Sequence, residues 1–254
     1  MILDKFKLDG QVALVTGAGT GMGQAIAFAL AEAGADIAGI YRTHSAETQA
    51  GVERLGRAFI PKQIDLGEAT ATELRLLVED VVQLMGGLDI LVNCAGVIDR
   101  VPVLDFPEDV WEQTLRVNLS ALFYLTQAAA QYFVGQGHGK VINVASILAY
   151  QGGFTVPAYA ASKAGVLNVT QAFANELASK GVNVNCIVPG FMATDFTKPL
   201  QDDPARSAPI LSRIPAGRWG RAEDVQGAAV FLASAAADFV HGAAIAVDGG
   251  WLGR

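Results

Sequence analysis

Ser146, Tyr159 and Lys163 have the side chains and the spacing for proton transfer, in the stretch VASILAYQGGFTVPAYAASKAG. A tyrosine and a lysine four residues apart lie on one face of a helix, one turn from each other. The ordinary pKa of a phenol is near ~10, and we expect the Lys163 ammonium to lower it toward the range where acid–base catalysis works. Ser146, at the end of a preceding strand, can hold a substrate oxygen against the phenol. These groups suit proton transfer at an alcohol or carbonyl oxygen and lack only a hydride carrier.

A glycine-rich turn near the amino terminus predicts the site for such a carrier. An apolar strand over 12–15 leads into Gly17, Gly21 and Gly23, spaced G-x3-G-x-G, and then into an alanine-rich helix. Glycines here suit a tight turn, close approach to a pyrophosphate and close packing of helix on strand. Such turns also form for purely local backbone reasons. This one opens a βαβ unit, however, which favours dinucleotide binding.

The elements that must position these groups alternate along the chain. Seven strand-like runs are separated by helical segments, which predicts an α/β fold with a parallel sheet and helices on both faces. The runs lie near 11–16, 36–41, 57–61, 88–93, 139–145, 182–188 and 243–248.

Four further motifs follow in one order, and the whole chain resembles the short-chain dehydrogenase/reductase family. They are Asp65, the turn Asn93-Cys94-Ala95-Gly96 with Cys94 in place of the family's second asparagine, Asn118, and Pro189-Gly190 followed by Thr194. The resemblance implies that Asn118, Ser146, Tyr159 and Lys163 are catalytic, with Asn118 holding a water in the proton relay. It also implies a set of cofactor contacts: Gly17, Thr20, Gly21, Met22, Gly23, Tyr41, Arg42, Asp65, Leu66, Asn93, Ala95, Gly96, Tyr159, Lys163, Pro189, Gly190 and Thr194.

Each catalytic assignment has an alternative, and so does Asp65. Tyr159 can be an amphipathic core tyrosine, Lys163 a solvated helix lysine and Ser146 a cap at a strand end. Asn118 can instead be a helix residue that bonds a backbone carbonyl. Asp65 can instead cap the following helix.

The family resemblance further implies one Rossmann-type doubly wound domain over residues 1–254, with strand order 3-2-1-4-5-6-7. The order reverses between the first and fourth strands, so we expect the ligand outside their carboxyl ends. Homotetramers are implied as well, with the helical segment 110–133 and the Tyr159 helix at one interface and the C-terminal DGGWLGR at another.

The opening MILDKFKLDG, the segment YQGGFTVPAYAASKAGV and the ending RIPAGRWG…VDGGWLGR are similar to one branch of the family. This branch comprises bacterial 2-deoxy-D-gluconate 3-dehydrogenases, also described as 2-dehydro-3-deoxy-D-gluconate 5-dehydrogenases. It implies hydride transfer between a nicotinamide and a secondary alcohol or ketone of a sugar acid, in uronate, pectin or alginate breakdown. Alternatives are a gluconate 5-dehydrogenase, a 3-oxoacyl reductase, a steroid or cyclic-alcohol dehydrogenase, or a non-catalytic dinucleotide-binding sensor.

The choice between NAD(H) and NADP(H) stays open in the sequence. The second strand ends at Tyr41 and Arg42, without the acid that bonds the 2′-hydroxyl of NAD, and Arg42 can pair with a 2′-phosphate. Thr20, however, occupies a position that is often basic in NADP-preferring relatives. We lean to NAD(H), on resemblance alone.

A sugar-acid substrate requires a group that receives its carboxylate. Arg100, in the loop after the Asn93 turn, is the first candidate, and Arg206, Arg213 and Arg218 are further ones. An ordinary solvated arginine is the alternative reading. Gln151 can bond sugar hydroxyls. We expect residues 191–215 to form a substrate lid, the alternative being a plain surface connection.

Composition excludes several other classes. A net charge of −7 leaves no basic footprint for nucleic acid. The long uncharged stretches are broken by polar residues, glycines and a proline, which does not fit a membrane span, and MILDKFKLDG is charged too early for a secretory signal. We therefore expect a cytoplasmic protein. Cys94 and Cys186, in strands that are not neighbours, should stay unpaired, and three scattered histidines predict no metal site.

Overall fold

The computed structural model describes all 254 residues, and its seven strands pair in parallel in the order β3-β2-β1-β4-β5-β6-β7. This confirms the expected fold class and strand order. The strands are β1 (Val12–Thr16), β2 (Asp36–Tyr41), β3 (Phe59–Gln63), β4 (Ile90–Asn93), β5 (Gly139–Val144), β6 (Val182–Pro189) and β7 (Ala244–Val247).

The strand β3 begins two residues later than expected and contains Pro61. A proline cannot donate a ladder hydrogen bond, so it is tolerated in a strand at the edge of a sheet. β3 is one of the two edge strands and pairs with β2 alone.

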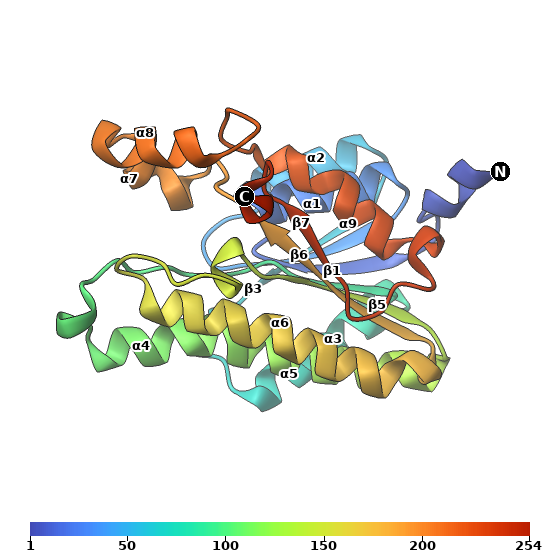
Figure 1. Ribbon diagram of the computed structural model, residues 1–254. Helices are drawn as coiled ribbons and strands as arrows, with labels where there is room; N and C mark the ends of the chain where they lie inside the picture. Colours follow the sequence, from blue (N-terminus) through green and yellow to red (C-terminus); the bar gives the residue numbers. More distant parts are fainter.

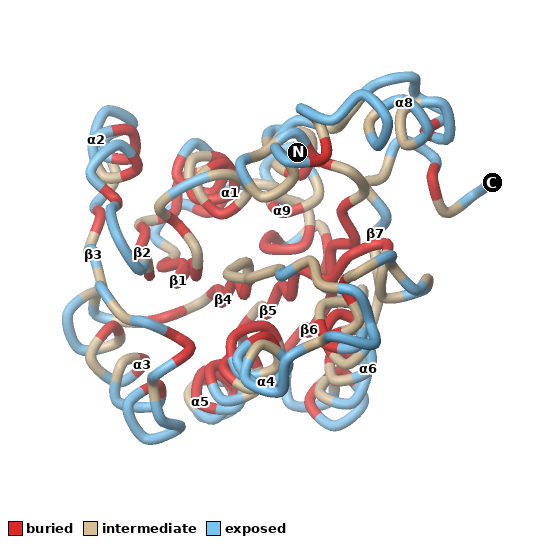
Figure 2. Tube along the Cα trace, turned by 90° about the vertical axis from the view of Figure 1, so that its left-hand side faces the viewer, coloured by how far each residue is buried: buried red, intermediate tan, exposed pale blue.

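Helices cover both faces of the sheet (Figures 1 and 2). One layer holds α1 (Gly21–Glu32), α2 (Ala46–Arg54) and α9 (Gln226–Ala233), and the other holds α3 (Ala71–Met85), α4 (Glu108–Leu115), α5 (Ala121–Gln136) and α6 (Pro157–Leu177). Each layer packs its own cluster of buried side chains against the sheet. The central strands β1, β4 and β6 are buried along their whole length, as expected for a parallel sheet covered twice.

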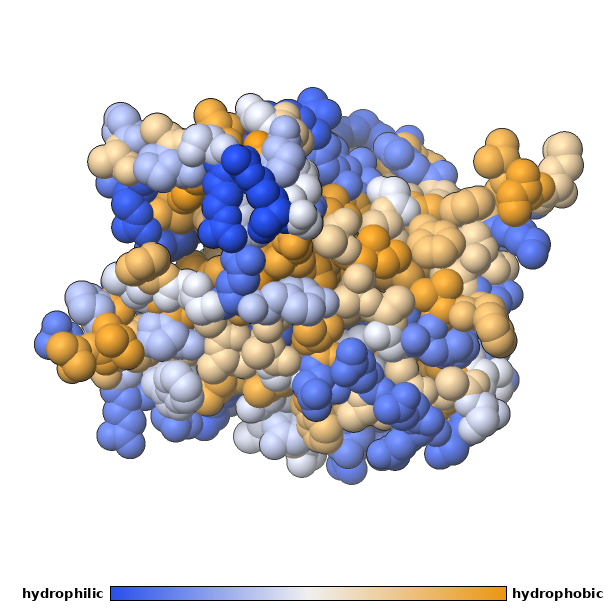
Figure 3. Space-filling model, in the orientation of Figure 1, coloured by the Kyte–Doolittle hydropathy of each residue, from blue (hydrophilic) through white to orange (hydrophobic).

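Two shorter helices depart from the alternating rhythm. After β6 the chain forms α7 (Lys198–Gln201) and α8 (Pro204–Arg213), which project beyond the sheet (Figure 1). Figure 3 shows a cleft between this segment and the helical layer on the other side, with hydrophobic side chains inside it and strongly hydrophilic ones at its rim. The segment expected to be a lid therefore borders an open cleft.

The segment 110–133, expected as one apolar helix, contains a local irregularity. α4 and α5 are joined by a π-helical turn over Arg116–Ser120. Such turns occur mostly as single insertions in α-helices, frequently at functional sites. Here the turn carries Asn118.

None of the helices is long and apolar enough to cross a membrane. Cys94 and Cys186 are free. Cys94 directly follows β4, Cys186 lies in β6, and β5 separates these two strands. No group of three or more His, Cys, Asp or Glu side chains is placed to hold a metal ion.

Candidate active site

A cavity of about 700 Å³ lies at the carboxyl ends of the central strands. This size is typical of small-molecule sites. It brings together most of the residues predicted from the sequence: Gly17, Thr20, Gly21, Met22, Gly23, Ala95, Gly96, Arg100, Ser146, Gln151, Tyr159, Lys163, Pro189, Gly190 and Thr194. It does not bring in Tyr41, Arg42, Asp65, Leu66, Asn93 or Asn118, which lie outside its lining.

The glycine turn packs tightly against the turn after β4. Gly17 has φ +70°, and a Cβ there would lie 3.0 Å from the Cα of Ala95. A Cβ on Gly23 would collide with the carbonyl oxygen of Gly17. The Thr16 hydroxyl joins the two turns, because it accepts from the backbone N–H groups of Cys94 and Ala95, each at 3.0 Å. Sequence analysis missed Thr16, since a buried threonine at a strand end carries no local signal.

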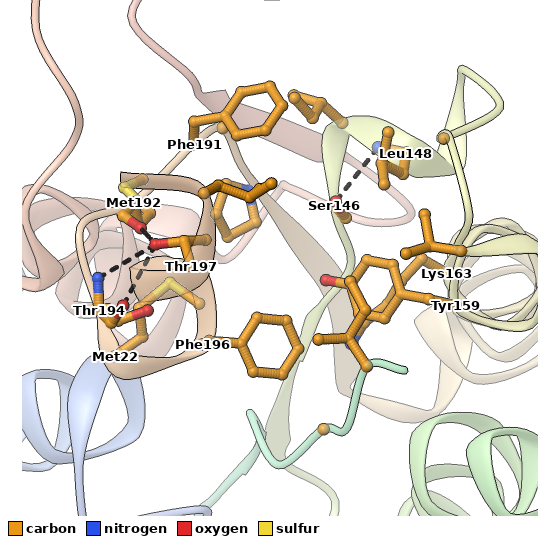
Figure 4. A pocket seen from close by; sticks show the side chains of 18 of the residues that line it. Met22, Ser146, Leu148, Tyr159, Lys163, Phe191, Met192, Thr194, Phe196 and Thr197 are labelled. Atoms are coloured by element: carbon orange, nitrogen blue, oxygen red, sulfur yellow. Dashed lines mark hydrogen bonds between the residues drawn. The ribbon is translucent and has the colours of Figure 1, made fainter. Parts of the chain in front are cut away.

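Tyr159 and Lys163 stand one turn apart at the beginning of α6. Pro157 begins this helix, where its fixed φ suits the first turn. Lys163 is 4% exposed, and its ammonium donates to the carbonyl oxygen of Val144 at 2.8 Å and lies 5.7 Å from the centre of the Tyr159 ring. Ser146 follows β5, and its hydroxyl accepts from the backbone N–H of Leu148 at 3.1 Å. Figure 4 shows the Tyr159 hydroxyl pointing into the pocket, with Phe196 facing its ring.

Burial dominates the electrostatics of these groups. It raises the pKa of Tyr159 to about 12, against a smaller opposing effect of the hydrogen bond with Ser146. It lowers the pKa of Lys163 to about 8. Burial thus shifts the Tyr159 pKa in the direction opposite to the one expected from a neighbouring ammonium, because it disfavours the charged phenolate. At neutral pH the Tyr159 phenol therefore carries its proton and is able to donate it.

Asn118 is 1% exposed, and its amide is fully engaged. It accepts from the backbone N–H of Val97 at 2.8 Å and donates to the Val97 carbonyl at 2.9 Å and to the Ser162 hydroxyl at 3.1 Å. It does bond a backbone carbonyl, as the alternative held, but that carbonyl belongs to the loop after β4 rather than to its own helix. The side chain joins that loop to α6.

Several predicted cofactor contacts surround the cavity instead of lining it. Asn93 donates from within the sheet to Thr126 and Asn143. Asp65 accepts from the N–H of Gly67 at 2.8 Å, so it forms a local turn and does not cap the following helix, which is capped by Thr70. Leu66 is buried against the α3–α5 layer. Tyr41 is the last residue of β2, and Arg42 follows it with an exposed side chain that pairs with no acidic group.

Arginines gather at the other end of the cavity. Arg100, Arg206 and Arg213 all line it, and none of them forms a salt bridge within the chain. Burial, and then the like charge of Arg206, lower the pKa of Arg100. Arg218 was a wrong candidate: its guanidinium is held by both carboxylate oxygens of Asp224, at 2.6 and 3.1 Å, and lies outside the cavity.

Several residues that line the cavity were not predicted from the sequence. Apolar side chains make up much of the remaining lining, among them Ile98, Leu148, Phe191, Met192, Phe196 and Trp251. Phe196 stacks near Tyr159, with ring centres 5.8 Å apart. Its place in the segment expected as a lid was the only available signal.

Cys94 stands where the family motif has its second asparagine. Burial raises the pKa of its thiol to about 11, so the group is a neutral thiol at pH 7. It stands next to the Ala95–Gly96 turn as a small, unreactive side chain.

The arrangement defines a dinucleotide-binding oxidoreductase. Gly17 lies in the turn before α1, Gly21 and Gly23 lie in its first turn, and all three line a cavity that continues to the Tyr159 hydroxyl. The N-terminus of a helix at such a turn suits a pyrophosphate. The residues therefore fit a nicotinamide dinucleotide, which when bound supplies or accepts the hydride. The chain places the Tyr159 hydroxyl in the same cavity.

Comparison with known proteins agrees with this class. A family model described as "Enoyl-(Acyl carrier protein) reductase" matches residues 17–252. A 2-dehydro-3-deoxy-D-gluconate 5-dehydrogenase of Bacillus subtilis (strain 168) is 52% identical over 254 residues, covering 99% of this chain and 98% of the relative. This protein belongs to the short-chain dehydrogenase/reductase family and is an oxidoreductase.

Two solved structures are also similar over nearly the full length. One is a putative 2-deoxy-D-gluconate 3-dehydrogenase of Agrobacterium tumefaciens with bound NADP, 49% identical, with a TM-score of 0.93 over 98% of this chain and 99% of that one. The other is a gluconate 5-dehydrogenase of Burkholderia cenocepacia in complex with NADP and tartrate, 38% identical, with a TM-score of 0.95 over 100% of both chains. A nicotinamide dinucleotide is thus supported as cofactor, whereas the lean to NAD(H) finds no support.

Proposed function

We propose that this enzyme transfers hydride between NADP(H) or NAD(H) and the C5 alcohol or ketone of 2-dehydro-3-deoxy-D-gluconate. One observation carries the substrate class. A proton donor, Tyr159, shares its cavity with three arginines that have no carboxylate partner in the chain. An anionic substrate supplies that partner. Similarity at 52% identity to a dehydrogenase of this sugar acid supports the choice within the class.

The roles of the residues follow from their positions. For reduction, Tyr159 gives its proton to the carbonyl oxygen as the carbon receives hydride, and the Ser146 hydroxyl steadies that oxygen. Lys163 places a positive charge under the phenolate that forms, which stabilises it. Asn118 holds the loop after β4 against α6. We propose that it also supports the water chain that returns the proton. Oxidation uses the same groups in reverse order, with Tyr159 as base.

We further propose that Arg42 allows NADP(H) to bind. The backbone of Arg42 is held by a hydrogen bond from Gln63 to its carbonyl oxygen, at 3.0 Å, while its guanidinium is free of acidic partners. No carboxylate ends β2 to repel a 2′-phosphate. The NADP in two similar structures supports this choice over our lean to NAD(H).

The experiment is a nicotinamide absorbance assay of the purified protein with 2-dehydro-3-deoxy-D-gluconate, run separately with NADP⁺ and NAD⁺. Parallel reactions contain D-gluconate, 2-deoxy-D-gluconate, a cyclic alcohol and a 3-hydroxyacyl thioester. The proposal predicts the highest kcat/KM for the first substrate. A higher value for the cyclic alcohol or the thioester would overturn the sugar-acid assignment and leave the dehydrogenase class standing.

We also propose a cytoplasmic homotetramer. Apolar side chains on α4 and α5 are partly exposed, Trp111, Tyr124 and Val134 among them, and an interface between copies would cover them. Two free thiols suit a reducing compartment. Sedimentation at equilibrium tests the assembly, and a monomer at micromolar concentration would contradict it.

A further inference from the structure

Gln151 is held at one end of its amide by two donors. Its Oε1 accepts from the indole N–H of Trp251 at 3.0 Å and from Nη2 of Arg213 at 3.4 Å. An indole nitrogen and a guanidinium can only donate, so the atom that faces them both must be the amide oxygen. The amide nitrogen of Gln151 has no partner in the chain. Since Gln151 lines the cavity, it offers only donors there.

Trp251 is held in place by contacts other than those with Gln151 and Arg213. It is 6% exposed and lies in the C-terminal turn Trp251–Gly253. The carboxylate of Asp248 holds this turn by accepting from the N–H groups of Gly250 and Leu252, each at 2.8 Å. The Phe191 ring packs against the indole, with ring centres 4.8 Å apart.

Arg213 is positioned by the same indole. Its guanidinium carbon lies 4.0 Å from the centre of the Trp251 ring, a distance typical of a cation–π contact. Trp251 therefore contacts both Gln151, which lies 100 residues away in sequence, and the last residue of α8. It sets two donors side by side at the wall of the cavity.

We propose that Trp251 is a positioning residue for substrate specificity: it turns the Gln151 amide so that its N–H₂, beside Arg213, receives an oxygen acceptor such as the carboxylate or 2-oxo group of the substrate. This inference rests on the proposed function and deepens it. A side-chain amide free to rotate could accept from a sugar hydroxyl or donate to it. With its oxygen already engaged, Gln151 donates only, which favours an oxo-acid end over a polyol end.

The first test is Gln151→Glu. Glutamate has the same shape and still accepts from Trp251 and Arg213, but it presents an anionic oxygen where the wild type presents N–H₂. We expect KM for 2-dehydro-3-deoxy-D-gluconate to rise at least about tenfold, while KM for NADP⁺ stays unchanged.

The second test separates positioning from packing. Trp251→Phe keeps an aromatic ring near Phe191 and Arg213 but removes the indole N–H, together with some ring volume, so the amide can turn over. We expect KM for the acid to rise about three- to tenfold with little change in kcat. Trp219→Phe is the matched control, because Trp219 also contacts the Phe191 ring, at 5.6 Å, but lies outside the cavity. Its KM should equal that of the wild type.

The double variant Gln151→Glu with Trp251→Phe should have the KM of Gln151→Glu alone, because a carboxylate has two equivalent oxygens and no orientation to fix. Equal KM values for Trp251→Phe and Trp219→Phe, or a further rise in the double variant, would overturn the inference. Failure of the proposed function is a different result, namely a wild-type enzyme that turns over no sugar acid.

Discussion

The two ends of the cavity are built in different ways. At the cofactor end, backbone packs on backbone: Gly17 lies against Ala95, and the Thr16 hydroxyl bonds the N–H groups of the facing turn. At the substrate end, arginine side chains line the cavity: Arg206 and Arg213 come from the exposed helix α8 and the partly buried Arg100 from the loop after β4. Binding at the first end is therefore inseparable from the fold. Binding at the second can change with single side chains.

The contrast also explains how an acidic protein accepts anionic ligands. The chain carries a net charge of −7. The cavity nevertheless collects Arg100, Arg206, Arg213 and Lys163 and only one acidic side chain, Asp195. Local charges at close range outweigh the field of distant surface carboxylates, which solvent and salt screen.

The proton donor between the two ends should give the largest effect. Tyr159→Phe removes the hydroxyl and keeps the ring that packs near Phe196, so we expect kcat to fall about 10²- to 10⁴-fold, the usual contribution of a general acid. Cofactor binding, measured by NADPH fluorescence titration, should persist. Retention of most of the activity would mean that another group supplies the proton.

A smaller effect is expected from the backbone contacts of the cofactor end. Gly23→Ala forces a Cβ against the Gly17 carbonyl, and we expect a loss of about 1–3 kcal/mol in the free energy of unfolding together with weakened NADPH binding. Gly135→Ala in α5 is the control, because nothing lies near its Cβ position. It should stabilise the protein by about 0.5–1 kcal/mol. Urea unfolding measures the stability of both variants. An equal change in the free energy of unfolding would contradict the close contact between Gly23 and the Gly17 carbonyl.

The smallest effect is expected at the substrate end. Arg206→Ala removes one unpaired charge from an exposed part of the cavity, so we expect KM for a sugar acid to rise about threefold to tenfold, with Tm unchanged. Arg218→Ala is its counterpart, since Arg218 is paired with Asp224 outside the cavity. Its KM should not change. A large loss of stability in Arg206→Ala would contradict the comparison, because it would show that the substrate end contributes to folding as the cofactor end does.

Much of the architecture was predictable because it is encoded at short range. Alternating apolar runs gave the seven strands to within two residues, and the glycine spacing predicted the turn that Gly17 and Gly23 form. The spacing of Tyr159 and Lys163 predicted one helix face, which α6 provides. The strand order required the family resemblance, since no local pattern determines which strands become neighbours.

What the sequence by itself determined, then, is the chemistry available to this protein: a tyrosine, a lysine and a serine at fixed spacing, and a glycine turn that admits a dinucleotide. Only the tertiary structure decided how that chemistry is tuned. It buried Tyr159 and Lys163 and so moved their pKa values in directions opposite to their simple pairing. It also paired Arg218 with Asp224 and brought Trp251 to Gln151 across 100 residues. Spacing along the chain sets only local geometry, whereas desolvation and the partners of a side chain depend on everything that packs around it.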